Sequence, residues 1–252
     1  MPQYDMPEMA HTRLKPPLNW LAKLSWPRRQ WLLLLVSALF LFLTFEYSPL
    51  DMVLERLFFD PINNVFPARR TWFFENFMHD GIRRATILAV CAASVICFFG
   101  IAGKLHWLPR RNSWLALLGM LIIAGMTPLL KIITNRHCPW SLVEFGGFAP
   151  YDTLSSPAPA SLKAGRCFPS GHASSGYLWL AWFFALRPVR RRSARLALAA
   201  GLFLGGLFGL SRMAQGAHFL SHVLWSLWFA WAISLTLTLL LKVETKCPRR
   251  PP

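Results

Sequence analysis

The sequence has few charged residues and very few acidic ones. Charged side chains make up 15% of the 252 residues, and 11 Asp and Glu stand against 27 Lys and Arg, which gives a formal net charge of +16. This scarcity of charge argues against a soluble domain, because 54% of the residues are hydrophobic and they form long apolar runs separated by short basic loops. Such a pattern is typical of a membrane protein. Because the basic residues mostly flank the apolar runs, we do not expect nucleic acid as a partner.

Further absences narrow the class of protein. No charged residue lies in the middle of an apolar run, which argues against a transporter, because an ion pathway usually needs one there. No small-residue cleavage site follows the first apolar run, so we expect a retained anchor rather than a signal peptide. The chain contains no internal repeat and no low-complexity segment.

The apolar runs predict an all-α fold, an integral membrane bundle of six helices. The expected order is a basic tail at 1–30, two spans with an outer segment at 31–112, a core of four spans at 113–241 and a second basic tail at 242–252. The mixed composition at 46–84 predicts short helices that lie at the membrane interface. The six expected spans are about Trp31–Phe45, Ala85–Gly103, Ser113–Leu130, Ala173–Arg187, Leu196–Leu210 and Val223–Leu241.

Six spans place both termini on the same side of the membrane. Most Lys and Arg lie in the two tails and in the loops at 104–111 and 187–195, which indicates that this side is cytoplasmic. The segments at 46–84, 131–168 and 211–222 then face the outside.

Three glycines lie within the fifth expected span. Gly201 and Gly205 are four residues apart, and Gly206 follows directly. Small residues let neighbouring helices approach closely, so we expect a packing role for them.

The stretch Pro169-Ser170-Gly171-His172 has the composition of a turn that leads into an apolar helix. Pro suits the first positions of a helix, Ser caps it, and Gly lets the backbone approach a ligand closely. The free amides and the positive end of the helix dipole favour an anion, most naturally phosphate. His172 is then placed to give a proton to the leaving group of that anion.

Two other polar clusters are expected at the same outer face. The first follows the third span and contains Lys131 and Arg136. The second runs from Ser211 through Arg212 and His218 to His222. Phosphoryl transfer needs cations that hold the phosphoryl oxygens. It can also use one histidine that attacks phosphorus and another that protonates the leaving group.

These clusters resemble the type 2 phosphatidic acid phosphatase (PAP2) superfamily of membrane lipid phosphatases, whose pattern is K-x6-R-P, P-S-G-H and S-R-x5-H-x3-D. Pro169 to His172 match the second motif, and Ser211-Arg212 with His218 match the third. Two positions depart from the pattern. Cys138 stands in place of the usual Arg, with Arg136 two residues earlier, and His222 stands in place of the final Asp.

The resemblance implies a role for each matched residue. His218 is expected to be the nucleophile that forms a phosphohistidine, and His172 the general acid. Arg136 is the expected substitute cation of the first motif. His222 takes the place of the carboxylate that orients the nucleophile, since a neutral imidazole also accepts a hydrogen bond. No metal and no cofactor are implied. The residues expected to bind phosphate are Lys131, Arg136, Ser170, Gly171 and Arg212.

The sequence thus predicts a membrane phosphatase that cleaves a phosphomonoester or diphosphate from a lipid at the outer face of the bacterial cytoplasmic (inner) membrane. Its expected partners are a phosphorylated lipid and the bilayer. The identity of the lipid and the oligomeric state are left open. Three alternatives remain: a lipid phosphotransferase of the same fold, a non-catalytic protein that binds lipid phosphates, and a zinc site made of His137, Cys138, Cys167 and His172.

Two of the five cysteines predict a disulfide. Cys138 and Cys167 flank the same outer loop, and the compartment outside the cytoplasmic membrane is oxidising. The remaining cysteines lie elsewhere, Cys91 and Cys97 in a span and Cys247 in the cytoplasmic tail. We therefore expect Cys138 to pair with Cys167.

Overall fold

The computed structural model describes residues 24–153, 159 and 161–244, and all regular secondary structure in these residues is helical. This confirms the all-α class. The expected basic tails lie mostly outside the described residues. In chain order the helices are α2 (Trp26–Tyr47), α3 (Leu50–Glu55), η1 (Arg56–Phe58), η2 (Pro67–Arg70), η3 (Phe73–Gly81), α4 (Ile82–Ile101), α5 (Arg110–Thr134), η4 (Pro139–Ser141), η5 (Val143–Phe145), α6 (Gly171–Tyr177), α7 (Leu180–Leu186), α8 (Arg191–Ala214) and α9 (Leu220–Leu240).

Five helices in the described part of the chain are long and apolar enough to cross a membrane, at Trp26–Tyr47, Phe73–Ile101, Arg110–Ser141, Arg191–Ala214 and Leu220–Leu240. The expected fourth span, Ala173–Arg187, is instead two seven-residue helices, α6 and α7. The chain keeps a helical course between them, because Trp179 and Ala181 donate backbone hydrogen bonds three residues back, to Gly176 and Leu178. A tightened turn therefore divides this segment.

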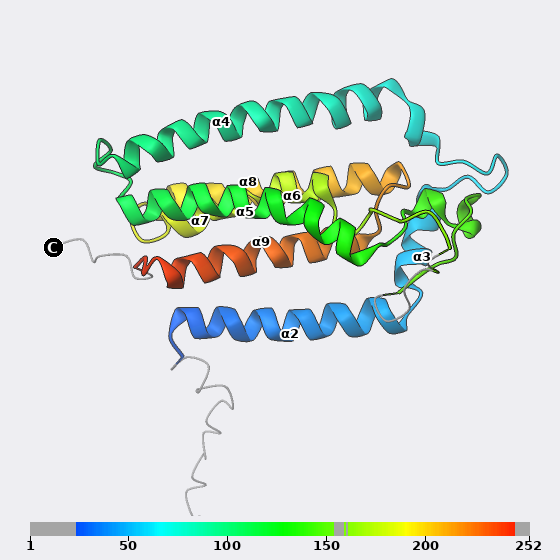
Figure 1. The fold of residues 1–252 in the computed structure, drawn as a ribbon, viewed down its shortest axis with the longest axis horizontal. Helices are drawn as coiled ribbons and strands as arrows, with labels where there is room; N and C mark the ends of the chain where they lie inside the picture. Colours follow the sequence, from blue (N-terminus) through cyan, green and yellow to red (C-terminus); the bar gives the residue numbers. More distant parts are fainter. Residues whose placement is uncertain (1–23, 154–158, 160, 245–252) are drawn as a thin grey trace, which may run out of the picture.

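The long helices run side by side, with α4 and α2 on opposite flanks of the bundle (Figure 1). The core lies among α5, α7, α8 and α9, where Leu115, Met120, Leu180, Phe184 and Leu235 are buried. Many apolar side chains point outward instead, Phe40, Leu88 and Phe203 among them. An apolar outer surface is what a lipid environment requires of a helix bundle.

The described chain begins and ends at the same end of the bundle (Figure 1). The opposite end carries α3, the short helices η1 to η5 and the connection between α8 and α9. The expectation of short helices in the segment 46–84 agrees with α3, η1, η2 and η3.

Two of the three glycines in α8 allow close packing. A Cβ on Gly201 would lie 3.0 Å from Leu180 Cδ2, and one on Gly205 would overlap the ring of Tyr177 on α6. Gly206 differs, because nothing lies within 4 Å of the position of its Cβ. The packing role therefore holds for Gly201 and Gly205 but not for Gly206.

Replacement of Gly205 by alanine should destabilise the protein, because the new methyl group must displace Tyr177 in a packed interior. The expected loss is about 1–3 kcal/mol, seen as a lower thermal unfolding temperature in detergent. Gly206→Ala is the matched control, and it should leave the unfolding temperature unchanged or slightly raised, since alanine favours helix. Equal unfolding temperatures for the two variants would contradict this packing.

Helix α3 carries two buried carboxyl groups, Asp51 and Glu55, and packs against the start of α9. Asp51 Oδ1 accepts a hydrogen bond of 3.0 Å from the backbone amide of Ser221, in the first turn of α9. Burial raises the pKa of Asp51 to about 6. Burial and the neighbouring charge of Asp51 raise the pKa of Glu55 to about 9. In the residues that the structure describes, neither carboxyl oxygen of Glu55 has a hydrogen-bond partner. Glu55 is therefore protonated in the folded protein at neutral pH.

This protonation couples stability to pH. Between about pH 4.5 and 9 the folded state keeps a proton on Glu55 that the unfolded state has released, so the free energy of unfolding falls as pH rises through this window. Glu55→Gln mimics the protonated form at every pH, and it should raise the unfolding free energy at pH 8 by at least about 1.4 kcal/mol, the equivalent of one pKa unit. The measurement is thermal unfolding at pH 5 and pH 8. The exposed Glu144→Gln is the control, and parallel pH profiles for wild type and Glu55→Gln would disprove the coupling.

Candidate functional site

Three polar clusters meet at the end of the bundle that carries the short helices (Figure 1). Lys131 lies in the last turn of α5, Ser170 caps α6, and Arg212 lies in the last turn of α8. His218 and His222 lie on either side of the start of α9. The antiparallel course of the helices therefore assembles residues that are far apart in the sequence.

Lys131 reaches the first turn of α6. A Cβ on Gly171 would lie 3.7 Å from Lys131 Nζ, an ordinary contact, so the ammonium group rests over the bare backbone of Gly171. In the described chain the backbone amides of Gly171 and His172 have no hydrogen-bond acceptor. An anion bound beside Lys131 thus meets both a cation and backbone donors.

The turn before α6 is fixed by hydrogen bonds to α9. Ser170 donates its amide to the carbonyl of His222 at 3.3 Å, and Ser226 Oγ donates to the carbonyl of Ser170 at 3.1 Å. Ser170 Oγ accepts from the amide of Ala173 at 3.3 Å, as a helix cap does. These contacts hold His172 in a fixed position at the start of α6.

His218 is buried and lies within the influence of several positive groups. Burial, followed by the charges of Lys131, His222, Arg212 and His172, holds the pKa of His218 well below its usual value. Its imidazole is therefore neutral at pH 7 and keeps a lone pair, as a nucleophile requires. The groups acting on it include no carboxylate.

His222 lies next to His218 without a hydrogen bond to it. The two ring centroids are 5.7 Å apart, and within the described part of the chain the buried Nδ1 atoms of both rings have no hydrogen-bond partner. His222 instead meets the rings of Phe168 and Phe219 edge to face, at 5.3 and 5.5 Å. In this structure its backbone carbonyl, rather than its ring, makes the polar contacts.

The disulfide expected from the sequence is present: Cys138 and Cys167 are joined, with their Cα atoms 5.2 Å apart. The bond fastens the segment after α5 to the turn before α6. The amide of Cys167 also donates to the carbonyl of Arg136 at 2.9 Å. Because both sulfurs are used, the zinc alternative loses its thiolate ligands, and the described residues contain no cluster of three or more suitable metal ligands.

Arg136 is directed away from the phosphate-binding candidates. One Nη donates to the backbone carbonyl of Asp152, and the guanidinium lies 5.9 Å from the centre of the Phe168 ring. Arg136 borders the same small space as Asp51, on the α2 side of the bundle. The structure thus brings Lys131, Ser170, Gly171, His172, Arg212, His218 and His222 together and leaves Arg136 behind them.

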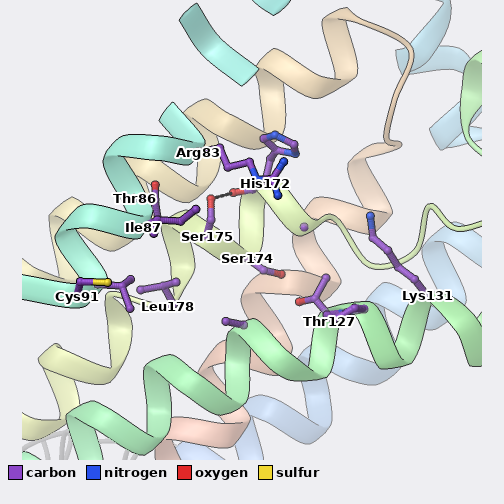
Figure 2. A pocket seen from close by; sticks show the side chains of 14 residues that line it. Arg83, Thr86, Ile87, Cys91, Thr127, Lys131, His172, Ser174, Ser175 and Leu178 are labelled. Carbon is purple, nitrogen blue, oxygen red and sulfur yellow. Dashed lines mark hydrogen bonds between the residues drawn. The ribbon is translucent and has the colours of Figure 1, made fainter. Parts of the chain in front are cut away.

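A cavity of about 570 Å³ opens between α4, α5 and α6 (Figure 2). Its polar end is formed by Lys131 and His172, with Arg83 from α4. The remainder is mainly apolar, so it suits a hydrocarbon chain whose polar group lies at Lys131. The apolar lining comprises Ile87, Val90, Ala124, Pro128 and Leu178.

His79 adjoins the site, although the sequence pattern had indicated only a segment of short interfacial helices there. The centroid of the His79 ring lies 4.6 Å from that of the His172 ring. His79 Nδ1 is 2.8 Å from Asp80 Oδ1. An adjacent His and Asp just before a span is the only sequence signal for this contact, and such a pair occurs too commonly to single it out.

Known proteins share sequence similarity with this chain. A model of the family described as the PAP2 superfamily matches residues 113–246, more than half of the chain. A protein named lipid A 4'-phosphatase, from Francisella tularensis subsp. novicida (strain U112), is 36% identical over 94 residues. That alignment covers 35% of this chain and only 39% of the relative. No solved structure matches the chain.

The geometry predicts that Lys131 contributes to anion binding. Lys131→Met should weaken binding of inorganic phosphate or vanadate about tenfold or more, because a charge-assisted contact contributes roughly 1.5–3 kcal/mol. Titration calorimetry of the protein in detergent measures this without any need for turnover. Lys104→Met, in the exposed loop between α4 and α5, is the control and should bind as the wild type does. Unchanged affinity in Lys131→Met would remove Lys131 from the anion site.

Proposed function

Because the chain belongs to the PAP2 superfamily, we propose that it hydrolyses a phosphomonoester or diphosphate of a membrane lipid through a phosphohistidine on His218. The observation that carries the proposal is the convergence of Lys131, Arg212 and His172 on a neutral, buried His218. Family membership and the relative named as a lipid A phosphatase support a lipid phosphatase kind of function. The apolar cavity at Lys131 supports a lipid rather than a soluble phosphate ester.

In the first step a ring nitrogen of His218 attacks phosphorus, and the bond from phosphorus to the leaving oxygen breaks. Lys131 and Arg212, with the amides at the start of α6, stabilise the charge on the non-bridging oxygens. His172 gives its proton to the leaving alcohol or phosphate. Burial, followed by the charges of Arg212, His79 and Lys131, lowers the pKa of His172 to about 3, whereas a bound phosphate dianion raises it. Substrate binding thus supplies the protonation state that the first step needs.

In the second step water attacks the phosphohistidine. His172, now neutral, accepts a proton from that water, and inorganic phosphate leaves with His218 restored. A phosphotransferase differs only here, since a lipid hydroxyl attacks in place of water. We place the reaction at the outer face of the bacterial cytoplasmic membrane, because the site lies at the end of the bundle opposite the basic loops at 104–111 and 187–195.

Replacement of His218 by alanine tests the mechanism. The variant should lose at least about a thousandfold in turnover, because no other group supplies the nucleophile. It should also form no acid-labile phosphoenzyme with labelled substrate. His106→Ala, at the far end of the bundle, is the control and should keep wild-type activity.

The assay uses phosphatidic acid, phosphatidylglycerophosphate, undecaprenyl diphosphate and lipid A, with and without a chelator. Release of inorganic phosphate indicates a hydrolase, whereas transfer to a second lipid indicates a phosphotransferase. Wild-type turnover in His218→Ala would refute the mechanism. Binding of lipid phosphates without turnover in the wild type would identify the non-catalytic alternative, which the departures at Cys138 and His222 favour.

A further inference from the structure

A second cavity, of about 260 Å³, is lined by Arg212 and by His79, whose ring contacts the ring of His172 in the lipid cavity. It is lined mainly by polar side chains from four parts of the chain: η2, η3, η4 and the end of α8. Cations dominate it, since Glu75 is the one acidic residue of its lining. The lining residues are Arg69, Arg70, Glu75, His79, Trp140, Arg212 and Gln215.

The walls of this cavity are held in place by specific contacts. The guanidinium of Arg69 lies 4.4 Å from the centre of the Trp140 ring, and that of Arg212 lies 5.7 Å from it. Gln215 Oε1 accepts from Arg212 Nη1 at 2.7 Å, and Gln215 Nε2 donates to the carbonyl of Arg69 at 3.5 Å. Trp140 donates its amide to the carbonyl of Gly216 at 2.9 Å. Arg69 and Arg212 are therefore held by specific contacts, whereas Arg70 is exposed.

The cavity carries more positive than negative charge. Burial and the neighbouring charge of Arg70 lower the pKa of Arg69, a sign that cations crowd there. Arg212 Nε is buried and has no hydrogen-bond partner among the described residues. If Arg212 serves the reacting phosphate, Arg69 and Arg70 still outweigh Glu75 by one unit charge. One further anionic group would neutralise this excess.

The second cavity adjoins the reaction site. Arg212 lines the cavity, and its charge acts on Lys131 and His172. His79 also lines it and contacts the ring of His172. A phosphate bound near Lys131 and Arg212 therefore lies close to both the apolar cavity, which Lys131 lines, and the Arg69–Arg70 cavity, which Arg212 lines. The rest of a head group has room to extend into the latter.

We propose that Arg69 and Arg70 bind a second anionic group of the substrate head group, so that the preferred substrate is a lipid phosphate with two anionic groups. This inference rests on the proposed function. The second anionic group is either bonded directly to the reacting phosphate, as in a diphosphate, or separated from it by a glycerol or a sugar. The inorganic phosphate released by hydrolysis is also an anion that these arginines could bind. The test below distinguishes binding of a head group from binding of released phosphate.

The test compares binding and turnover of matched lipids by the full chain in detergent. The short-spaced pair is polyprenyl diphosphate and polyprenyl phosphate. The longer pairs are phosphatidylglycerophosphate with phosphatidic acid, and a doubly phosphorylated disaccharide lipid with its singly phosphorylated form. Binding is measured by calorimetry on the His218→Ala protein, so that the result does not depend on turnover. The wild type should prefer the doubly anionic member of at least one pair by about tenfold or more in kcat/KM, and His218→Ala should show the same preference in Kd.

Arg69→Gln/Arg70→Gln should abolish this preference in both measurements, chiefly through weaker binding of the doubly anionic lipid. Arg191→Gln/Arg192→Gln removes two adjacent, exposed arginines at the other end of the bundle and should keep the preference. Arg70→Gln alone is the second variant, because Arg70 is exposed and its loss leaves the Arg69–Trp140 contact in place. It should reduce the preference.

Each other outcome overturns the inference. The cavity does not recognise the head group if the wild type shows no preference in any pair. The same conclusion holds if the preference survives in Arg69→Gln/Arg70→Gln. Weaker inhibition by inorganic phosphate in that variant, with unchanged lipid selectivity, assigns the cavity to product release instead. In all these cases His218-dependent hydrolysis of phosphatidic acid still supports the proposed function. If the wild type binds the doubly anionic lipid selectively but hydrolyses none of the lipids, the proposed function is refuted and the anion-binding role of Arg69 and Arg70 stands.

Discussion

The site depends on the hydrogen bonds that join the start of α9 to the turn before α6. Ser170 is held by the carbonyl of His222 and by the hydroxyl of Ser226. Asp51 holds the same end of α9 through the amide of Ser221. These contacts link α3, α6 and α9, so the position of His172 relative to His218 is set by backbone and capping interactions. A precise distance between two reacting groups needs that rigidity.

Positive charge is concentrated where the bundle is least able to solvate it. Lys131, Arg212 and the buried histidines lie at the end of an apolar bundle, and no carboxylate is among the groups that act on His218. Like charges in a buried setting oppose folding, and a bound anion offsets that cost. Such local conflict between stability and charge is expected at functional sites. Burial among positive charges also disfavours the protonated form of His218, so this buried imidazole is neutral.

The two departures from the family pattern have different structural consequences. Cys138, in place of an arginine, closes a disulfide to Cys167 and so fastens the segment after α5 to the turn before α6. Arg136 does not take over the missing position, because its guanidinium is occupied by the carbonyl of Asp152 and by Phe168. His222 lies among aromatic rings. The first motif therefore contributes one cation to the site, Lys131, and the third contributes Arg212.

The sequence by itself determined the membrane class, the all-α fold, the apolar runs of the five long helices, the disulfide and the three polar clusters, but it placed the start of the second span at Ala85, whereas that helix begins at Phe73. These follow from apolar run length, from motif spacing and from the pairing of thiols in one loop, which are local properties of the chain. Only the tertiary structure decided that the fourth expected segment is divided into α6 and α7 and that Gly205 packs while Gly206 does not. It alone showed that Arg136 points away from the site and that His79, Arg69 and Arg70 adjoin it. The physical reason is that a side chain's neighbours depend on contacts between distant segments, which no periodicity along the chain records.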